Sequence, residues 1–219
     1  MAKTQGDHAV KGDLRADGNA KFLKGVDSPY LEIIDEKARG IDGGTFTGHD
    51  PSTQSWRTRD ITTVLFNDFA TAVVSGAADL LAGATATKGD GGKITLPAGI
   101  YYTEISCPAE SVDAHVARLA DVTDNPGATG STVILGTSEF AADANIWEDS
   151  TGSALDIFSS SVTRSNVYGK FQLTSSRTLE IQHRCRTTQI NTGFGGDGDF
   201  YEAPNIYTTL RMWRIRDDS

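Results

Sequence analysis

The sequence predicts an all-β fold, an antiparallel β-sandwich of the jelly-roll type formed by residues 28–219 and preceded by an extended arm, residues 1–27. Three observations carry this prediction. Many short segments alternate apolar and polar residues, as strands with one buried face do. Runs rich in Gly, Asn, Asp and Pro separate these segments, as turns do. No repeat with a period of about 20–50 residues is present, which argues against solenoids and propellers.

The strand candidates begin at residue 30 and continue to residue 215. In order they are 30–37, 55–66, 101–107, 115–122, 131–138, 161–173, 177–187 and 205–215. The alternation is clearest in 177–187, where one face is Leu179, Ile181, His183 and Cys185 and the other is Glu180, Gln182, Arg184 and Arg186. In 161–173, the face that we expect to point inward is Val167, Phe171 and Leu173.

Turn residues predict two of the connections. Leu96-Pro97-Ala98-Gly99 forms a corner, because Pro fixes φ and Gly adopts conformations that other residues resist. We expect this corner to pass the chain between strands of the sandwich, after which one face carries Tyr101, Thr103, Ile105 and Cys107. Residues 174–176 are predicted to be a short hairpin link between the strands on either side.

The last strand candidate, 205–215, is apolar on both faces. One face carries Tyr207, Trp213 and Ile215, with Trp213 expected in the core, and the other carries Ile206, Leu210 and Met212. A strand that is apolar on both faces is typically buried on both, so we expect the second face to meet another subunit or another sheet. Together with the amphipathic 177–187 strand, this surplus of apolar surface predicts a homotrimer.

Two segments differ from the strand pattern. Residues 1–27 hold few large apolar side chains and many Gly, Asp and Lys, so this arm has too little apolar surface to fold alone, and we expect a partner to order it. Within 69–92, a helix from Phe69 to Leu81 competes with a long loop, because Gly76 and the β-branched residues before it weaken the helix.

Composition narrows the range of partners. The net charge of −9 argues against nucleic acid, because phosphate binding needs clustered Lys and Arg. No run of about 18 apolar residues is present, so no membrane insertion is expected. With 2 Cys in 219 residues and no apolar leader, we expect a reducing cytoplasm at synthesis and free, buried thiols at Cys107 and Cys185.

The patterns for metal sites are weak. His115, His183, Cys107 and Cys185 are zinc-ligand types, but the closely spaced Cys pairs typical of structural zinc are missing. Core histidines and small buried thiols explain the same residues. The Gly-rich stretch 193–201 carries two Asp residues, but it fits neither the calcium nonapeptide nor the EF-hand pattern. We therefore expect no metal and no cofactor.

Catalytic patterns are equally weak. Glu139, Asp143, Glu148 and Asp149 are carboxylates of the kind that flank a sugar in glycosidases, but acidic loop residues are more often solvated surface. The nucleophile elbow, the P-loop and the zinc-protease helix motif do not occur. We therefore expect that the protein is not an enzyme.

The longest polar connections, around 141–152 and 188–204, contain four aromatic residues among Gly, Asn and Asp. These are Trp147, Phe194, Phe200 and Tyr201. Rings and amides suit contact with a glycan or a protein surface, so these four are the candidate receptor-contact residues. The alternative is that the rings cover the ends of the jelly roll, and the sequence leaves the two open.

The order of motifs adds a resemblance. The segments are DEKARGIDGGTFTG, SWRTRDITTVLFND, LPAGIYYTEISCPA, HVARLADVTD, VILGTSEFA, LEIQHRCRTTQINTGFG and YTTLRMWR. Over about residues 30–216 the chain resembles a family of bacteriophage virion proteins, found as fibre or tail-fibre C-terminal domains and similar to the trimeric tumour-necrosis-factor-like jelly roll. The chain is longer than that family at 69–92 and 141–160. The resemblance implies a homotrimer in the virion and no catalytic residues.

These observations favour a non-enzymatic fibre or spike knob of a phage particle, a homotrimer assembled in the host cytoplasm. Residues 1–27 would attach it to other virion proteins, and its loops would contact a host surface glycan or protein. One alternative is a capsid decoration or cement protein that stabilises the phage head. Another is a glycan depolymerase, which would release reducing sugar from host polysaccharide.

Overall fold

The computed structural model describes the chain in segments. They are residues 15–16, 20–21, 29–48, 56–67, 73–75, 92–124, 130–142, 147–148, 154–155, 161–201 and 203–216. All regular secondary structure in these segments is β-strand, and none of them forms a helix able to cross a membrane. Of the predicted arm, only the backbone of β1 (Arg15–Ala16) and β2 (Ala20–Lys21) is described, and these two strands pair.

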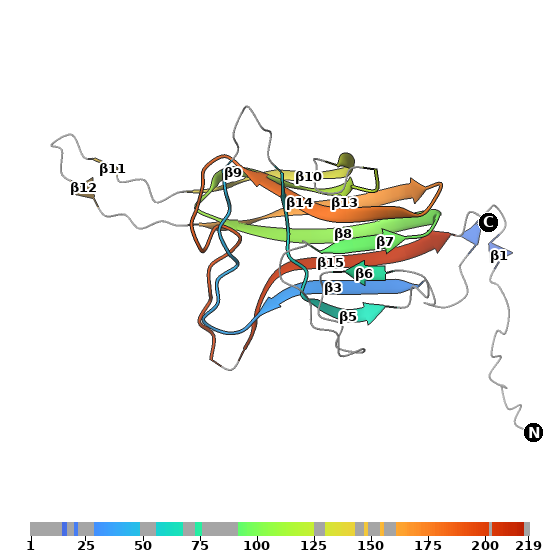
Figure 1. Ribbon diagram of the computed structural model, residues 1–219, viewed down its shortest axis with the longest axis horizontal. Coiled ribbons are helices and arrows are strands. Elements are labelled where there is room, and N and C mark those ends of the chain that lie inside the picture. The colour runs from blue at the N-terminus through green and yellow to red at the C-terminus, as the bar shows by residue number, and fades with distance from the viewer. Residues whose placement is uncertain are drawn as a thin grey trace, which may run out of the picture.

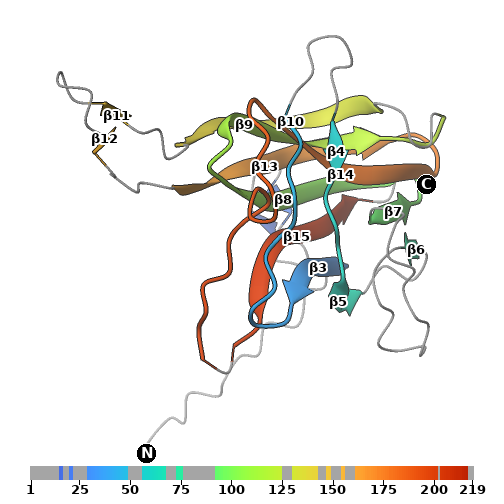
Figure 2. The same ribbon diagram turned by 60° about the vertical axis from the view of Figure 1, so that its left-hand side comes forward.

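Two antiparallel sheets pack face to face (Figure 1). The first sheet has the order β13 (Val162–Leu173), β8 (Gly99–Glu110), β15 (Asn205–Arg216), β3 (Tyr30–Lys37) and β5 (Thr63–Asn67). The second has the order β10 (Ser131–Ala141), β9 (Asp113–Asp121), β14 (Arg177–Cys185), β7 (Lys93–Leu96) and β6 (Val73–Ser75). In the second sheet β4 (Arg57–Thr58) pairs with β14, as Figure 2 shows. A separate pair is β11 (Trp147–Glu148) with β12 (Ala154–Leu155).

The connections make this sandwich a jelly roll. The chain passes from β7 in the second sheet to β8 in the first, and from β13 in the first to β14 in the second. As a result β15 lies between β3 and β8, strands from distant parts of the sequence. Crossing between sheets in this way is how a jelly roll winds its two Greek keys. The predicted fold class, an all-β antiparallel sandwich of the jelly-roll type, is confirmed.

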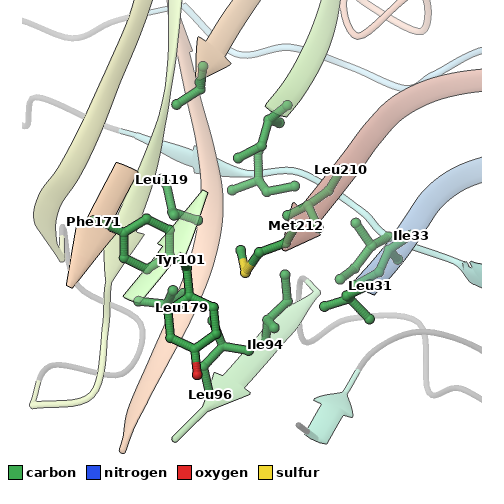
Figure 3. Close-up of a cluster of buried hydrophobic side chains, with 14 of the residues drawn as sticks. Leu31, Ile33, Ile94, Leu96, Tyr101, Leu119, Phe171, Leu179, Leu210 and Met212 are labelled. Carbon is green, nitrogen blue, oxygen red and sulfur yellow. The ribbon is translucent and has the colours of Figure 1, made fainter. Parts of the chain in front are cut away.

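The core fills the space between the sheets. Figure 3 shows its central side chains, which are Leu31, Ile33, Tyr101, Phe171, Leu210 and Met212 from the first sheet and Ile94, Leu96, Leu119 and Leu179 from the second. The predicted inward faces of 101–107, 161–173 and 177–187 all point into the interior and are buried. Each fully buried aliphatic side chain contributes roughly 1.5–3 kcal/mol relative to an exposed one, so period-two burial provides most of the driving force for this fold.

The corner at Pro97 is where the chain leaves the second sheet for the first, as predicted. The hydroxyl of Tyr101 donates a hydrogen bond of 2.8 Å to the Pro97 carbonyl oxygen and ties the corner to the next strand. A Cβ added at Gly99 would lie 3.0 Å from Nε of Arg214, which leaves little room for a side chain there.

Three sequence predictions are corrected by the topology. Residues 174–176 are not a hairpin link, because β13 and β14 lie in different sheets. Segment 55–66 is not one strand: β4 pairs with β14, β5 pairs with β3, and the residues between cross from one sheet to the other. A helix through 73–75 is wrong, since these residues form β6 against β7. The rest of 69–91 lies outside the described residues.

A β-bulge changes which side chains of β15 face inward. The pairing with β3 shifts register between Ile206 and Thr209, and the two residues of the bulge, Tyr207 and Thr208, are both buried. Because the bulge adds one residue, the strand behind it points Trp213 to the outer face of the first sheet. The expectation that Trp213 lies in the core is therefore wrong: its ring packs on the surface between Tyr30 and Tyr102.

Candidate interaction surfaces

The outer face of the first sheet carries a row of side chains across all five of its strands. In register order the row is Tyr168, Glu104, Arg211, Glu32 and Phe66. Nε of Arg211 donates a hydrogen bond of 2.9 Å to Oε1 of Glu32. Because residues that pair directly across strands point the same way, this row places one cation between two carboxylates, with an aromatic ring at each end.

A second row on this face is aromatic. The ring of Trp213 lies 5.2 Å from that of Tyr30 and 5.9 Å from that of Tyr102, and Tyr30 lies 5.8 Å from Phe66. Tyr168 is 62% exposed and Phe66 is 48% exposed. A shallow hollow of about 290 Å³, bordered by Tyr102 and Tyr168, opens on the same face. We call these rows together the first-sheet face.

The outer face of the second sheet is partly covered. The Trp56 ring lies beneath two guanidinium groups, 4.0 Å from that of Arg118 and 4.9 Å from that of Arg184. Arg118 donates two hydrogen bonds to Oε1 of Gln182, of 3.1 and 2.7 Å, and Gln182 donates to Glu180 at 3.0 Å. Gln182 and Glu180 are therefore buried, although strand alternation alone would expose them.

Two loops at one end of the sandwich are joined by backbone hydrogen bonds. Loop 38–48 follows β3 and loop 186–201 follows β14, and they lie side by side in Figures 1 and 2. The Gly43 N–H donates to the Gly195 carbonyl at 2.8 Å, and the Phe194 N–H donates to the Gly44 carbonyl at 3.0 Å. The Gly-rich stretch 193–201 is thus held against the first loop by its own backbone.

The two Asp residues of that stretch have protein partners. Oδ1 of Asp199 lies 2.8 Å from a guanidinium nitrogen of Arg39. Oδ2 of Asp197 accepts a hydrogen bond of 3.0 Å from the Gly40 N–H, and Oδ1 accepts one from the side-chain amide of Asn205. Hydrogen bonds from Asp199 and Asn205 hold the pKa of Asp197 below its ordinary value. Both carboxylates therefore fasten loop 186–201.

Phe194 is a packing residue rather than an exposed ring. Its centroid lies 4.4 Å from that of Phe46 and 4.2 Å from the guanidinium carbon of Arg59. Arg59 is 1% exposed and donates hydrogen bonds to Oγ1 of Thr208 at 2.8 Å and to the carbonyls of Pro108 and Phe194 at 3.2 and 3.1 Å. This buried guanidinium joins the crossing segment, the bulge of β15 and loop 186–201.

Two of the other candidate receptor-contact residues, unlike Phe194, have exposed rings. Phe200 is 71% exposed and Tyr201 is 78% exposed, and the Arg39 guanidinium lies 5.4 Å from the Tyr201 ring centre. Trp147 is in β11, and its side chain lies outside the described part of the chain. The structure thus brings Phe200 and Tyr201 together on one exposed loop and separates Phe194 from them. Receptor contact stays a prediction.

A buried histidine pair was not anticipated as a unit. Nδ1 of His115 lies 2.9 Å from Nε2 of His183, and Nε2 of His115 lies 2.8 Å from Oγ1 of Thr163. Burial, with a smaller contribution from Arg59, lowers the pKa of His115 to about 4 and that of His183 well below its ordinary value. Strand alternation placed His183 inward, but the pairing of β9 with β14, which sets His115 opposite Cys185 and His183 opposite Ala117, is what brings the two rings together as diagonal neighbours.

Both cysteines are free and buried, as predicted. Burial raises the pKa of Cys107 to about 11 and that of Cys185 to about 12, and Sγ of Cys185 donates to the Thr187 carbonyl at 3.1 Å. Within the described segments, no group of three or more His, Cys, Asp and Glu side chains is placed to bind a metal.

Comparison with known proteins gives structural similarity only. No family model matches the chain, and no curated protein matches it. Among solved structures, the chain is similar to the globular domain of zebrafish complement 1qA protein, with 11% identity, a TM-score of 0.38, and coverage of 87% of this chain and 100% of that one. It is also similar to murine APRIL at pH 8.0, with 9% identity, a TM-score of 0.34, and coverage of 85% and 98%. Both TM-scores are low, so the jelly-roll assignment rests on the strand order of this chain.

Proposed function

We propose that this chain is a non-enzymatic structural protein of a bacteriophage particle, a homotrimeric fibre or spike knob. In this proposal residues 1–27 attach the knob to other virion proteins, and the exposed loops contact a host surface glycan or protein. The motif order across residues 30–216, with its resemblance to phage fibre domains, supports the virion role. The observation that carries the assembly is the first-sheet face.

The first-sheet face has the composition of an interface. Aromatic rings and Arg are enriched at protein interfaces, and here Tyr30, Tyr102, Tyr168 and Trp213 surround Arg211 on one side of one sheet. A monomer would leave this aromatic surface in water, which is unfavourable for large contiguous apolar patches. In a three-fold ring a different surface of the neighbouring copy covers this face, and the hollow between Tyr102 and Tyr168 accepts a side chain from that copy.

Light scattering on the purified protein tests the assembly. We expect about 70 kDa, three chains of 23.4 kDa each. The variant Tyr168→Glu places a charge on the first-sheet face, and we expect it to yield monomer with an unchanged β-sheet spectrum. The matched control is Leu135→Glu, because Leu135 is 58% exposed on the other sheet. A trimer that survives Tyr168→Glu, or a monomeric wild type, would refute this interface.

Gold-labelled antibody on intact particles tests the virion role. A few sites at the tail support a fibre or spike, whereas many sites over the head would assign the chain to capsid decoration. Deletion of residues 1–27 should leave the domain folded and trimeric but absent from particles. Normal incorporation of this truncated protein would move attachment to the jelly roll.

A further inference from the structure

The outer face of the second sheet has two rows of side chains whose central members are small. One row is Ser138, Val116 and Arg184, from β10, β9 and β14. In the next row Phe140 pairs with Ala114, and the Arg186 N–H donates to the Ala114 carbonyl at 2.8 Å. Because residues paired across antiparallel strands point the same way, Phe140 and Arg186 stand on either side of Ala114.

The small side chains on the central strand leave a hollow. Its volume is about 470 Å³, and its lining includes Ala114, Val116, Ser138, Arg184 and Arg186. This volume is in the range of small-molecule sites, roughly 300–1,000 Å³. The hollow has an apolar floor, a hydroxyl on one wall and guanidinium groups on the other. Phe140, which is 58% exposed, stands beside it with its ring accessible.

Among the described residues, the two arginines that line the hollow, Arg184 and Arg186, have no acidic side chain as an ion-pair partner. The Trp56 ring, 4.9 Å from the Arg184 guanidinium, restricts that side chain. Burial, with a smaller contribution from the positive charge of Arg184, lowers the pKa of Arg118 to about 10. Cationic charge is thus concentrated on this face of a chain whose net charge is −9.

We infer that this hollow binds a saccharide bearing a carboxylate, such as a uronic or sialic acid residue. A guanidinium group presents two N–H donors in the geometry of a carboxylate, so Arg184 and Arg186 recognise the acid. Ser138 offers a hydroxyl for a sugar hydroxyl, and the Phe140 ring offers a flat apolar surface for the face of a pyranose. An inorganic anion would use the arginines but would gain nothing from Phe140 or the apolar floor.

This inference goes beyond the proposed function and does not depend on it. The hollow is on the second sheet, whereas the proposed assembly uses the opposite side of the sandwich, so trimer formation leaves the hollow open. The two can fail separately, because saccharide binding and oligomeric state are measured on the same purified protein by different methods.

Saturation-transfer difference NMR tests the inference with defined probes, since it detects weak sugar binding to a large protein. The probes are glucuronate and N-acetylneuraminate, with glucose as the neutral control and acetate as the acid control. We expect transfer to the ring protons of both acidic sugars, little to glucose, and loss of signal as salt rises, because the ion pairs are exposed. Signals for glucose equal to those for glucuronate, or acetate binding as tightly as glucuronate, would overturn it.

Variants locate the site. Arg186→Gln should weaken glucuronate binding about tenfold, the value of one charge-assisted hydrogen bond. Phe140→Ser should weaken the acidic sugars without changing acetate binding, and Ala114→Leu should fill the hollow and block all of them. The control is Arg177→Gln, which removes an arginine from the other end of β14. Melting temperatures confirm that each variant is folded. Unchanged glucuronate binding in Arg186→Gln and Ala114→Leu would refute the site.

Discussion

Nδ1 of His115 and Nε2 of His183 face each other at 2.9 Å in the interior, so one of the two nitrogens is protonated and donates a hydrogen bond to the other. Within the described residues, Nδ1 of His183 has no hydrogen-bond partner. We assign the tautomers so that this unpaired Nδ1 is an acceptor and not a buried N–H without a partner. His183 is then protonated on Nε2, and this N–H donates a hydrogen bond to Nδ1 of His115. His115 then donates from Nε2 to Thr163. Both rings are neutral in this arrangement.

The histidine pair predicts acid sensitivity. The folded-state pKa of His115 is about 4, below the unfolded value near 6.5, so the unfolded chain binds its proton first as pH falls. The stability from this residue is present above about pH 6.5 and decreases toward pH 4, by roughly 3 kcal/mol in total. Urea unfolding from pH 7 to pH 4 measures it, and His115→Gln should flatten the dependence.

The carboxyl group of Asp35 has the opposite effect on the free energy of unfolding over part of the range from pH 7 to pH 4. Burial raises its folded-state pKa to about 6, so its carboxyl group is protonated first in the folded chain and favours folding as pH falls. The variant Asp35→Asn removes this contribution and should steepen the loss of stability below pH 6. A wild-type curve that rises steadily from pH 7 to pH 4 would contradict the account of the histidine pair.

The buried guanidinium of Arg59 predicts a large stability effect. Arg59→Ala leaves the Pro108 and Phe194 carbonyls without their donor and creates a cavity, so we expect a loss of roughly 3–4 kcal/mol in the free energy of unfolding. Arg57→Ala is the matched control, because Arg57 is exposed two residues away and should change stability by about 0.5 kcal/mol or less. Arg59→Met, which keeps most of the volume, should lie between them. Equal stability of Arg59→Met and wild type would show that these hydrogen bonds have no net value.

We expect the two buried thiols to react slowly with alkylating reagents in the native protein. Because burial raises the pKa of Cys107 to about 11 and that of Cys185 to about 12, neither is a thiolate near neutral pH. Labelling with a maleimide at pH 7.5 should be slow in the native protein and fast in urea. Intact mass without reductant should show no loss of two hydrogens. Rapid native labelling of both thiols would contradict this placement.

Alanine variants of the aromatic residues in loop 186–201 distinguish rings that pack in the domain from rings that are free to contact a partner. Phe194→Ala removes a ring packed on Phe46 and Arg59 and should destabilise the domain by about 3 kcal/mol. Phe200→Ala and Tyr201→Ala remove exposed rings and should leave the melting temperature unchanged. If the chain is a phage knob, as proposed, and this loop contacts the host surface, the latter two variants, together with Trp147→Ala, should reduce adsorption of the phage. Full adsorption by all three would assign host contact elsewhere.

Period-two alternation predicts the strands because it reports a local property, burial on one face of an extended chain. It places β3, β13 and β14, and it identifies the inward residues of β13 and β14. Alternation does not indicate which strands pair with each other, and for that reason the expected hairpin at 174–176 is wrong. It also misses the bulge at Tyr207, which reverses the direction of every later side chain on β15. Arg59 appears in a polar run and is buried only because the chain crosses between sheets there.

For the candidate interaction surfaces too, the sequence predicts local exposure but not contacts between distant segments. Exposure of Phe200 and Tyr201 agrees with their polar, Gly-rich context, whereas Phe194 in the same stretch is covered because loop 38–48 lies against it. The first-sheet face and the hollow beside Phe140 combine residues from several strands each, far apart in sequence. No pattern within one segment indicates them, and only the register between strands brings them together.

The position of β15 between β3 and β8 has a consequence for biogenesis. The first sheet cannot close while the ribosome still holds residues 205–216, because the strand that joins its two halves is the last to emerge. Until then β3 and β8 each expose an unpaired edge to other chains. Folding is therefore completed after synthesis of the domain, with long-range pairing that closes slowly. Overexpression at low temperature, which slows synthesis and weakens hydrophobic association between nascent chains, should raise the soluble yield of this protein.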